Sequence, residues 1–237
     1  FSWIVEDINP EFTMGDMMRK RNEIIAQLKD EGVFDLQKEL RLSSFASRIA
    51  IISSNTAAGY GDFCNQLTNN EFGLTFQTEL FQATMQGNRT EGDIIACLNE
   101  INAREEEFDV VVIIRGGGAT ADLSSFDTLL LAENVANFPL PIITGIGHDR
   151  DESVLDLVSF LKVKTPTAAA AFLIERLSST LSRVLEAEKN IYDYVHRRLE
   201  REYNHLNNLA SRIPLLFSVV KTQQEFHLDR LLQKMIT

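Results

Sequence analysis

The sequence predicts an α/β fold with a doubly wound, mostly parallel sheet and a long, coiled-coil-like helical extension at the C-terminus. Three observations predict this class. Short apolar runs alternate with amphipathic segments as far as residue 165, with crossovers long enough for parallel pairing. The 237 residues are 44% hydrophobic, which suffices for one sizeable core. From about residue 167, apolar residues recur at three- and four-residue steps.

Two elements are expected before the first core strand. Residues 1–5 alternate loosely between apolar and polar side chains, which is typical of a strand. Residues 13–30 carry a helical apolar stripe, with Thr13 as the expected cap and Gly32 as the expected C-terminal stop.

The sheet is expected to contain four strands with helices between them. Apolar or Phe- and Thr-rich runs predict the strands, and apolar spacing behind polar start residues predicts the helices. In order, the predicted elements are strand 48–54, helix 57–67, strand 73–83, helix 90–106 with Thr90 as cap, strand 109–114, helix 122–135 and strand 141–146.

A single long helix is expected over residues 167–213, where neither proline nor glycine interrupts the pattern. Such a helix rises by about 65–70 Å at ~1.5 Å per residue, which is more than a globular domain uses. The segment is therefore predicted to be a coiled coil or a helical hairpin. Pro214 is expected to break it, with a second helix over 215–236.

Composition and charge limit the function. No apolar run approaches the ~20 residues of a membrane span, and no secretory signal is evident, so a cytoplasmic protein is expected. The chain lacks an initiating Met and is expected to be part of a longer protein. Cys64 and Cys97 have no metal or disulfide spacing, and we interpret them as small apolar helix positions.

The formal net charge of −11 is unevenly distributed. Residues 1–165 carry 13 Lys and Arg against 26 Asp and Glu, whereas residues 166–237 carry ten against eight. Phosphate contacts come from Lys and Arg, so an acidic body does not by itself indicate a nucleic-acid partner.

Arg115 carries the main chemical signal, because it ends a buried strand and precedes Gly116, Gly117 and Gly118. Ligands of open α/β sheets bind beyond the carboxyl ends of the strands. Successive glycines let backbone N–H groups approach an anion, and the helix expected from residue 122 would add its positive end. A glycine turn also serves merely to reverse the chain, but such a turn needs no arginine. Binding of an anionic group by these four residues is therefore predicted.

A second strand end carries groups suited to proton transfer. His148 follows the last predicted strand. Asp151, three residues on, would orient the imidazole or cap the next helix, and Asp149 is its competitor. Asp62 lies near the start of a helix, where a carboxylate also has the plain role of complementing the helix dipole.

Together these motifs resemble the catalytic domain of the exodeoxyribonuclease VII large subunit. The resemblance covers about residues 1–175 and continues as helical pattern. It is carried by residues 31–34, 48–54, Ala57 and Ala58 with Asp62, 115–118 with Asp122 and Leu123, Gly147 and His148 with Asp151, and Thr165 and Pro166 with 168–170.

The resemblance implies a metal-independent nuclease that degrades single-stranded DNA from its ends to short oligonucleotides. It also implies an OB-fold domain that grips DNA and a helical segment that binds several small subunits. The expected domains are then an OB-fold remnant (1–8), an α/β catalytic domain (9–170) and a truncated helical extension (171–237). A DNA grip on the absent OB-fold would reconcile the acidic charge with a DNA substrate.

The resemblance implies four catalytic residues: Asp62, Arg115, His148 and Asp151. Two positions depart from the family pattern, which usually has Ser at Ala119 and Glu at Asp149. The absent hydroxyl argues against an indispensable serine nucleophile at residue 119.

A hydrolytic mechanism fits these residues. Arg115 and the glycine N–H groups would bind the phosphate, because a guanidinium fork matches phosphate oxygens. His148 would be general base, general acid or nucleophile, with Asp151 fixing its tautomer and Asp62 positioning water or the imidazole. Alternatively, Asp62, His148, Asp149 and Asp151 would hold Mg²⁺, which prefers oxygen ligands.

Two other functions fit the sequence as well. One is a nucleotide- or phosphate-binding module with a helical assembly arm, and the other is a purely structural subunit.

Overall fold

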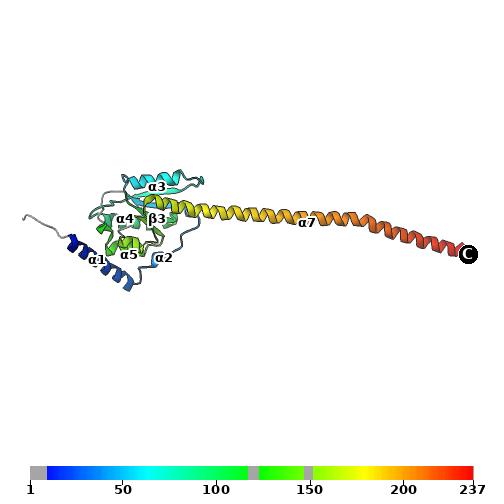
Figure 1. The fold of residues 1–237 in the computed structure, drawn as a ribbon, viewed down its shortest axis with the longest axis horizontal. Helices are drawn as coiled ribbons and strands as arrows, with labels where there is room; N and C mark the ends of the chain where they lie inside the picture. The colour runs from blue at the N-terminus through cyan, green and yellow to red at the C-terminus, as the bar shows by residue number, and fades with distance from the viewer. Residues whose placement is uncertain (1–9, 117–122, 147–151, 237) are drawn as a thin grey trace, which may run out of the picture. The chain divides into compact units, whose positions relative to one another are not determined.

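The computed structural model describes residues 10–116, 123–146 and 152–236. These residues form a five-stranded, all-parallel sheet in the order β2-β1-β3-β4-β5. Figure 1 shows β3 of this sheet, with α3 above it and α5 below it in the view. The predicted fold class and all four predicted strands are confirmed, and the fifth strand was not predicted. The strands are β1 Arg48–Ser53, β2 Gln77–Gln82, β3 Val110–Ile114, β4 Ile142–Gly145 and β5 Leu161–Lys162.

Seven α-helices and two short 3₁₀ turns are present in these described ranges. The strand and the domain remnant expected within residues 1–8 lie outside them, and the expected domain boundaries stay predictions. The helices are α1 Pro10–Asp30, α2 Leu36–Glu39, α3 Ala58–Thr68, α4 Thr90–Asn102, α5 Leu129–Ala136, α6 Val154–Val158 and α7 Pro166–Ile236, with 3₁₀ turns at Glu105–Glu107 and Ser124–Phe126.

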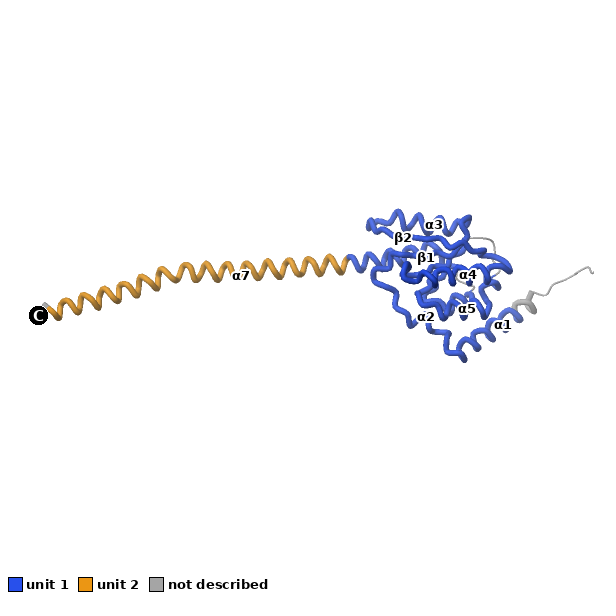
Figure 2. The backbone as a smooth tube through the Cα atoms, turned by 180° about the vertical axis from the view of Figure 1, so that it is seen from behind, with its two compact units in different colours: residues 1–181 blue, residues 182–237 orange. Residues whose placement is uncertain are grey.

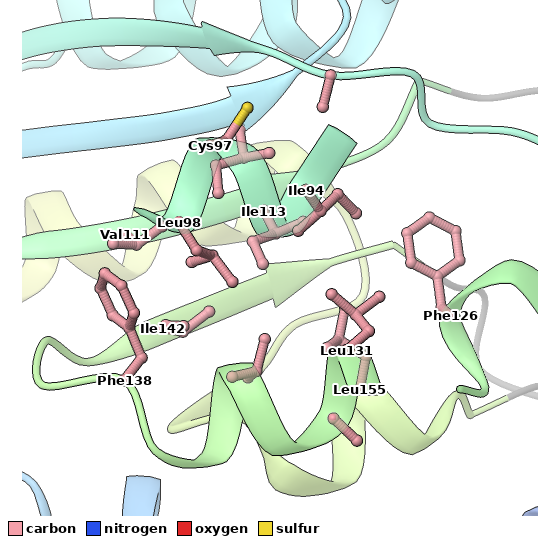
Figure 3. Packing of buried hydrophobic residues seen from close by; sticks show 14 of the residues in the cluster. Ile94, Cys97, Leu98, Val111, Ile113, Phe126, Leu131, Phe138, Ile142 and Leu155 are labelled. Carbon is pink, nitrogen blue, oxygen red and sulfur yellow. The ribbon is translucent and has the colours of Figure 1, made fainter. Parts of the chain in front are cut away.

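The sheet is buried on both faces, because successive side chains of a strand point to opposite sides. On one face, Val111 and Ile113 of β3 pack with apolar side chains of α1, α4, α5 and α6. Figure 3 shows part of this cluster, with Ile94 of α4 and Leu131 of α5 facing the strands. On the other face, Val112 and its neighbours pack with α3 and the first turns of α7. This is the doubly wound arrangement that the alternating elements predict.

The ends of α1 and α4 partly confirm the predicted signals. Gly32 has a φ of +74°, and the N–H of Val33 donates to the carbonyl of Leu28, which is the pattern of a glycine C-terminal stop. The predicted caps are wrong. The first helix begins at Pro10, which suits a first helical position, so Thr13 lies inside it. Thr90 is the first residue of α4 rather than its cap.

The helix expected from residue 122 is also corrected. Helix α5 begins at Leu129, after a 3₁₀ turn that contains Ser124 and Ser125. Short polar side chains favour such local turns over helix. The N-terminus of α5 therefore lies eleven residues after Gly118 in sequence, rather than the four expected from a start at residue 122. Asp122 itself lies outside the described residues.

Helix α6 begins with a complete capping box. The Ser153 hydroxyl accepts a hydrogen bond from the Asp156 N–H, and the Asp156 carboxylate accepts one from the Ser153 N–H. The cap of this helix is therefore Ser153, so capping was a wrong role for Asp151. The short β5 follows and extends the sheet beyond β4.

Helix α7 is continuous over 71 residues, so the expected break at Pro214 is wrong. An interior proline costs about 3 kcal/mol through one lost hydrogen bond and a steric clash. Ending the helix and starting another would leave several N–H and C=O groups without partners and would require a second nucleation. Continuing through one proline is the smaller cost. Thr165 and Pro166 begin the helix as predicted, with the Thr165 hydroxyl accepting from the N–H of Ala168 at 3.1 Å.

The chain divides into two compact units, residues 1–181 and 182–237 (Figure 2). The first turns of α7 belong to the first unit, where Ala169, Ala170 and Leu173 are buried in the core. Arg176 anchors them by donating to the carbonyls of Leu42 and Ser43. In unit 2, the described side chains are exposed. None of the described helices is both long and apolar enough to cross a membrane.

Gln37 of α2 is a fully buried polar residue that joins the N-terminal segment to the sheet. Its amide donates to the carbonyls of Phe138 (2.7 Å) and Leu140 (3.3 Å) and accepts from the N–H of Ile142 (2.9 Å). The chain immediately before β4 thus depends on one side chain for three hydrogen bonds.

We expect Gln37→Ala to lower the free energy of unfolding by about 2–4 kcal/mol, because it leaves buried backbone groups without partners. Urea denaturation of this chain measures the change. Gln27→Ala is the matched control, since Gln27 makes only an exposed hydrogen bond with Glu31 and should cost less than ~0.5 kcal/mol. Equal stabilities of the two variants would contradict the prediction.

Candidate active site

The carboxyl edge of the sheet has a topological switch point between β1 and β3. The chain leaves β1 toward β2 on one side, whereas β3 pairs with β1 on the other side. The connections that follow these two strands diverge, and ligands of open α/β sheets bind at such a switch point. The segments that follow β1 and β3 are therefore the expected position of a ligand site.

Arg115 is the first residue after β3, and it is held at this edge by the sheet itself. Its N–H donates to the Gly145 carbonyl at 3.3 Å, which continues the β3–β4 ladder by one step. Only 6% of the residue is exposed. Burial of a guanidinium is costly and places a fixed positive charge in low dielectric surroundings. The position suits an anionic ligand better than a purely structural turn.

Two glycines permit the segments after β1 and β3 to lie against each other. A Cβ on Gly59 would lie 2.8 Å from the Arg115 carbonyl oxygen and 2.8 Å from Cγ of Pro166. A Cβ on Gly116 would lie 3.0 Å from Cβ of Ala57. The absence of side chains at these positions therefore lets the start of α3, the end of β3 and the start of α7 meet.

A cleft of about 970 Å³ opens at this edge. It runs from Arg115 past the segment after β1 and the end of β2 to one side of α4. Its lining residues are Ser54, Thr56, Ala57, Ala58, Gln82, Ala83, Thr84, Met85, Gln86, Arg89, Asp93, Ala96, Cys97, Glu100, Arg115 and Gly116.

The ionisable groups of the cleft are balanced in number. Arg115 and Arg89 oppose Asp93 and Glu100. The pKa of Asp93 is lowered by hydrogen bonds from Thr84 and by the nearby Arg89, so this carboxylate is ionised at neutral pH.

Cys97 cannot supply a thiolate nucleophile in this cleft. Burial, with the charges of Glu100 and Asp93, raises the pKa of its thiol to about 11. Its Sγ lies 3.6 Å from the carbonyl oxygen of Gln82. The thiol is therefore protonated at neutral pH and acts as a small packing group, as the sequence predicts.

The start of α3 adds a positive helix end to the cleft. Ala57 and Ala58 line the cleft, and no side chain caps this helix. The N-terminal N–H groups and the dipole of an 11-residue helix favour an anion. The sequence predicts a helix end at the site from the helix after β3, whereas the structure provides it from the helix after β1.

Comparison with known proteins identifies the family. A sequence model of the family described as "Exonuclease VII, large subunit" matches residues 33–237. The chain belongs to this family. It is similar to the exodeoxyribonuclease 7 large subunits of Deinococcus radiodurans (34% identity over 81% of this chain and 46% of the relative) and Clostridium botulinum (29%, 88% and 51%). That of Lactobacillus helveticus is 26% identical over 90% of this chain and 47% of the relative.

The chain spans about half the length of these curated relatives of the exonuclease VII family. The resemblance deduced from the motifs is thereby confirmed for the family. The match begins at residue 33 and includes the cleft and all of α7.

The structure brings some of the predicted site residues together and leaves others apart. Arg115 and Gly116 line one cleft. Asp62 lies on α3, three residues after Gly59, but it is exposed and does not line the cleft. The predicted residues that lie outside the described ranges are Gly117, Gly118, His148 and Asp151.

The described flanks of the second segment lie at the same edge of the sheet. Gly145 accepts the hydrogen bond from Arg115, and Ile146 after it is buried. His148 is thus only three residues along the chain from the partner of Arg115. In the part of the chain that the structure describes, no group of three or more His, Cys, Asp or Glu is arranged to hold a metal ion.

Sequence reasoning missed most of the cleft wall. Gln82, Thr84 and Arg89 line the cleft but carry no motif. Gln82 ends β2, which the parallel register places beside β1. The available sequence signal was a polar residue at the end of a strand. It was missed because the predicted strand 73–83 extended past Gln82.

Proposed function

We propose that this chain is the catalytic part of a nuclease that hydrolyses phosphodiester bonds of single-stranded DNA from the ends and releases short oligonucleotides. Membership of the exonuclease VII large-subunit family supports the reaction class. The observation that carries the proposal is Arg115, buried at the switch point of the sheet beside the N-terminus of α3. A guanidinium and free helix N–H groups form a suitable environment for a phosphodiester.

Arg115 stabilises the charge that builds on the phosphate oxygens in the transition state. Gly116, Gly117 and Gly118 allow backbone N–H groups to approach the same phosphate. His148 transfers the proton between the attacking water and the leaving oxygen, and Asp151 holds its tautomer. The family resemblance assigns Asp62 the positioning of the water, although Asp62 is exposed on α3 and does not line the cleft.

The second unit serves assembly in this proposal. Val184, Ile191, Val195 and Leu199 of α7 are between 47% and 65% exposed, although they follow the spacing of a helical stripe. A long apolar stripe on one helix needs a partner to cover it. We assign this stripe to the binding of several copies of the small subunit, in a cytoplasmic enzyme. Because residues 1–165 are acidic and DNA phosphates are negative, we assign the main DNA-binding surface to another domain.

One cleavage assay tests both the catalytic role of His148 and the dependence of cleavage on a metal ion. In the full-length large subunit assembled with its small subunit, we expect His148→Ala to lower kcat on end-labelled single-stranded DNA by about 10²–10⁴-fold, the usual effect of losing a general acid or base. The exposed His205 on α7 provides the matched control, and His205→Ala should leave kcat unchanged.

Wild-type cleavage by His148→Ala would rule out its assigned role. The same assay in EDTA distinguishes metal-free proton transfer from catalysis by a bound metal ion. Persistent cleavage supports proton transfer by His148 with Asp151, whereas complete loss that Mg²⁺ restores supports an ion held by Asp62, His148, Asp149 and Asp151. If the assembled protein cleaves no DNA but mononucleotides shift its melting temperature, the phosphate-binding alternative replaces the nuclease.

A further inference from the structure

The cleft is much larger than one phosphate requires. A volume of about 970 Å³ is at the upper end of the range for pockets that enclose a whole small molecule. Arg115 lines one end of the cleft. The rest of the cleft forms an extension along the end of β2 and along α4. This extension lies over β2 and α4 rather than toward β4, which leads to His148. The assigned chemistry therefore leaves most of the cleft without a role.

One side of this extension carries neutral hydrogen-bonding groups, whereas the side on α4 presents Asp93, Ala96, Cys97 and Glu100. Ser54 and Thr56 come from the segment after β1, with their hydroxyl oxygens 3.0 Å apart. Gln82, Thr84 and Gln86 follow along and beyond the end of β2. Hydroxyl and amide groups of this kind suit a sugar and the edge of a base, which offer both donors and acceptors.

No aromatic ring is among the described residues that line the cleft. Stacking on aromatic side chains is the usual source of affinity for bases in single strands. A strand bound here must therefore be held mainly through its phosphates and by weak hydrogen bonds. That arrangement is insensitive to base sequence and sensitive to salt.

Arg89 is the second cation of the cleft and lies directly before α4. It is 83% exposed, and its Nη2 lies 3.8 Å from Oδ1 of Asp93. The other carboxylate oxygen of Asp93 accepts a hydrogen bond from the Thr84 N–H at 3.1 Å. The carboxylate is thus fixed to the wall, and it keeps the guanidinium near the cleft. An exposed ion pair of this geometry is weak, so the Arg89 guanidinium readily leaves Asp93 and binds a phosphate instead.

We propose that the part of the cleft between β2 and α4 seats the nucleotide next to the scissile phosphate, and that Arg89 binds the next phosphate along the strand. The inference rests on the proposed nuclease function and adds a substrate subsite to it. Arg115 and Arg89 then contact successive phosphates, and the hydroxyl and amide wall contacts the nucleoside between them. Arg89 is a binding residue and takes no part in proton transfer.

The subsite is tested with Arg89→Gln in the full-length large subunit assembled with its small subunit. The substrate is an end-labelled, single-stranded 20-nucleotide DNA. Loss of one charged phosphate contact should raise KM about tenfold and leave kcat within about twofold. The slope of log KM against log salt concentration should fall by about 0.7, the expected effect of one fewer phosphate contact on a single strand. Arg89→Lys should restore most of the slope, because it restores the charge.

Arg19→Gln is the matched control. Arg19 is likewise an exposed arginine with an i,i+4 carboxylate partner, Glu23, but it lies on α1 and outside the cleft. It should change neither KM nor the salt slope. Arg115→Ala is measured in parallel as the test of the site itself.

Three results would overturn some part of this assignment. Unchanged KM and slope in Arg89→Gln, with cleavage abolished in Arg115→Ala, would remove the subsite and keep the nuclease site. A loss of kcat in Arg89→Gln as large as in Arg115→Ala would place Arg89 in the chemistry and not in binding. Wild-type cleavage by Arg115→Ala would overturn the proposed function on which the subsite rests.

Discussion

Arg115→Ala is expected to lower kcat by about 10²–10³-fold in the assembled enzyme. Arg115 is only 6% exposed, and its backbone N–H continues the β3–β4 ladder at the edge where the substrate phosphate would lie. A preorganised charge beside the developing negative charge contributes about that much to transition-state stabilisation. Single-turnover cleavage of end-labelled single-stranded DNA measures the effect on the chemical step.

Arg115→Lys separates charge from geometry. Lysine restores the positive charge but not the planar fork, and it should remain at least about tenfold below the wild-type rate. Thermal denaturation of both variants checks that the domain stays folded. If Arg115→Ala cleaved at the wild-type rate with a native melting curve, the glycine turn after β3 would have no part in the chemistry.

Gly59→Ala is expected to destabilise the protein by about 1–3 kcal/mol and to lower cleavage strongly. The new Cβ would lie 2.8 Å from the backbone oxygen of Arg115 and 2.8 Å from a ring carbon of Pro166. Neither neighbour is the end of a flexible side chain, so α3 and the end of β3 must move apart. Overpacking of this kind has that cost, and it displaces the Arg115 backbone.

Gly61→Ala provides the matched control on the same helix. Nothing lies within 4 Å of a Cβ at Gly61, and the position is exposed. Because alanine is the better helix former, this substitution should be neutral or should stabilise by up to about 1 kcal/mol. Urea denaturation and the DNA cleavage assay are applied to both variants. If Gly59→Ala were as stable and as active as Gly61→Ala, the close approach between the end of β3 and α3 would not matter for function.

The errors of the sequence reasoning have a common physical origin. Helix α7 continues through Pro214 because one interior proline costs less free energy than two new helix ends. No local sequence rule compares these two costs. The start of α5 at Leu129 depends on turn preferences that compete with helix formation. The two-residue β5 and the buried Gln37 carry no periodic signal, because their stability comes from partners far away in the chain.

The sequence by itself determined the class of fold, the order of the main elements, the family and the residues proposed to carry chemistry. These depend on local periodicity, on turn residues and on short ordered motifs such as Arg115 with its glycines. Only the tertiary structure decided that the helix end at the site belongs to α3, that Asp62 is exposed outside the cleft, and that Arg89 lines it. The reason is that a cleft forms from neighbours in space. Parallel pairing places β2 beside β1 and the end of β3 against α3, and no pattern along the chain specifies which side chains meet there.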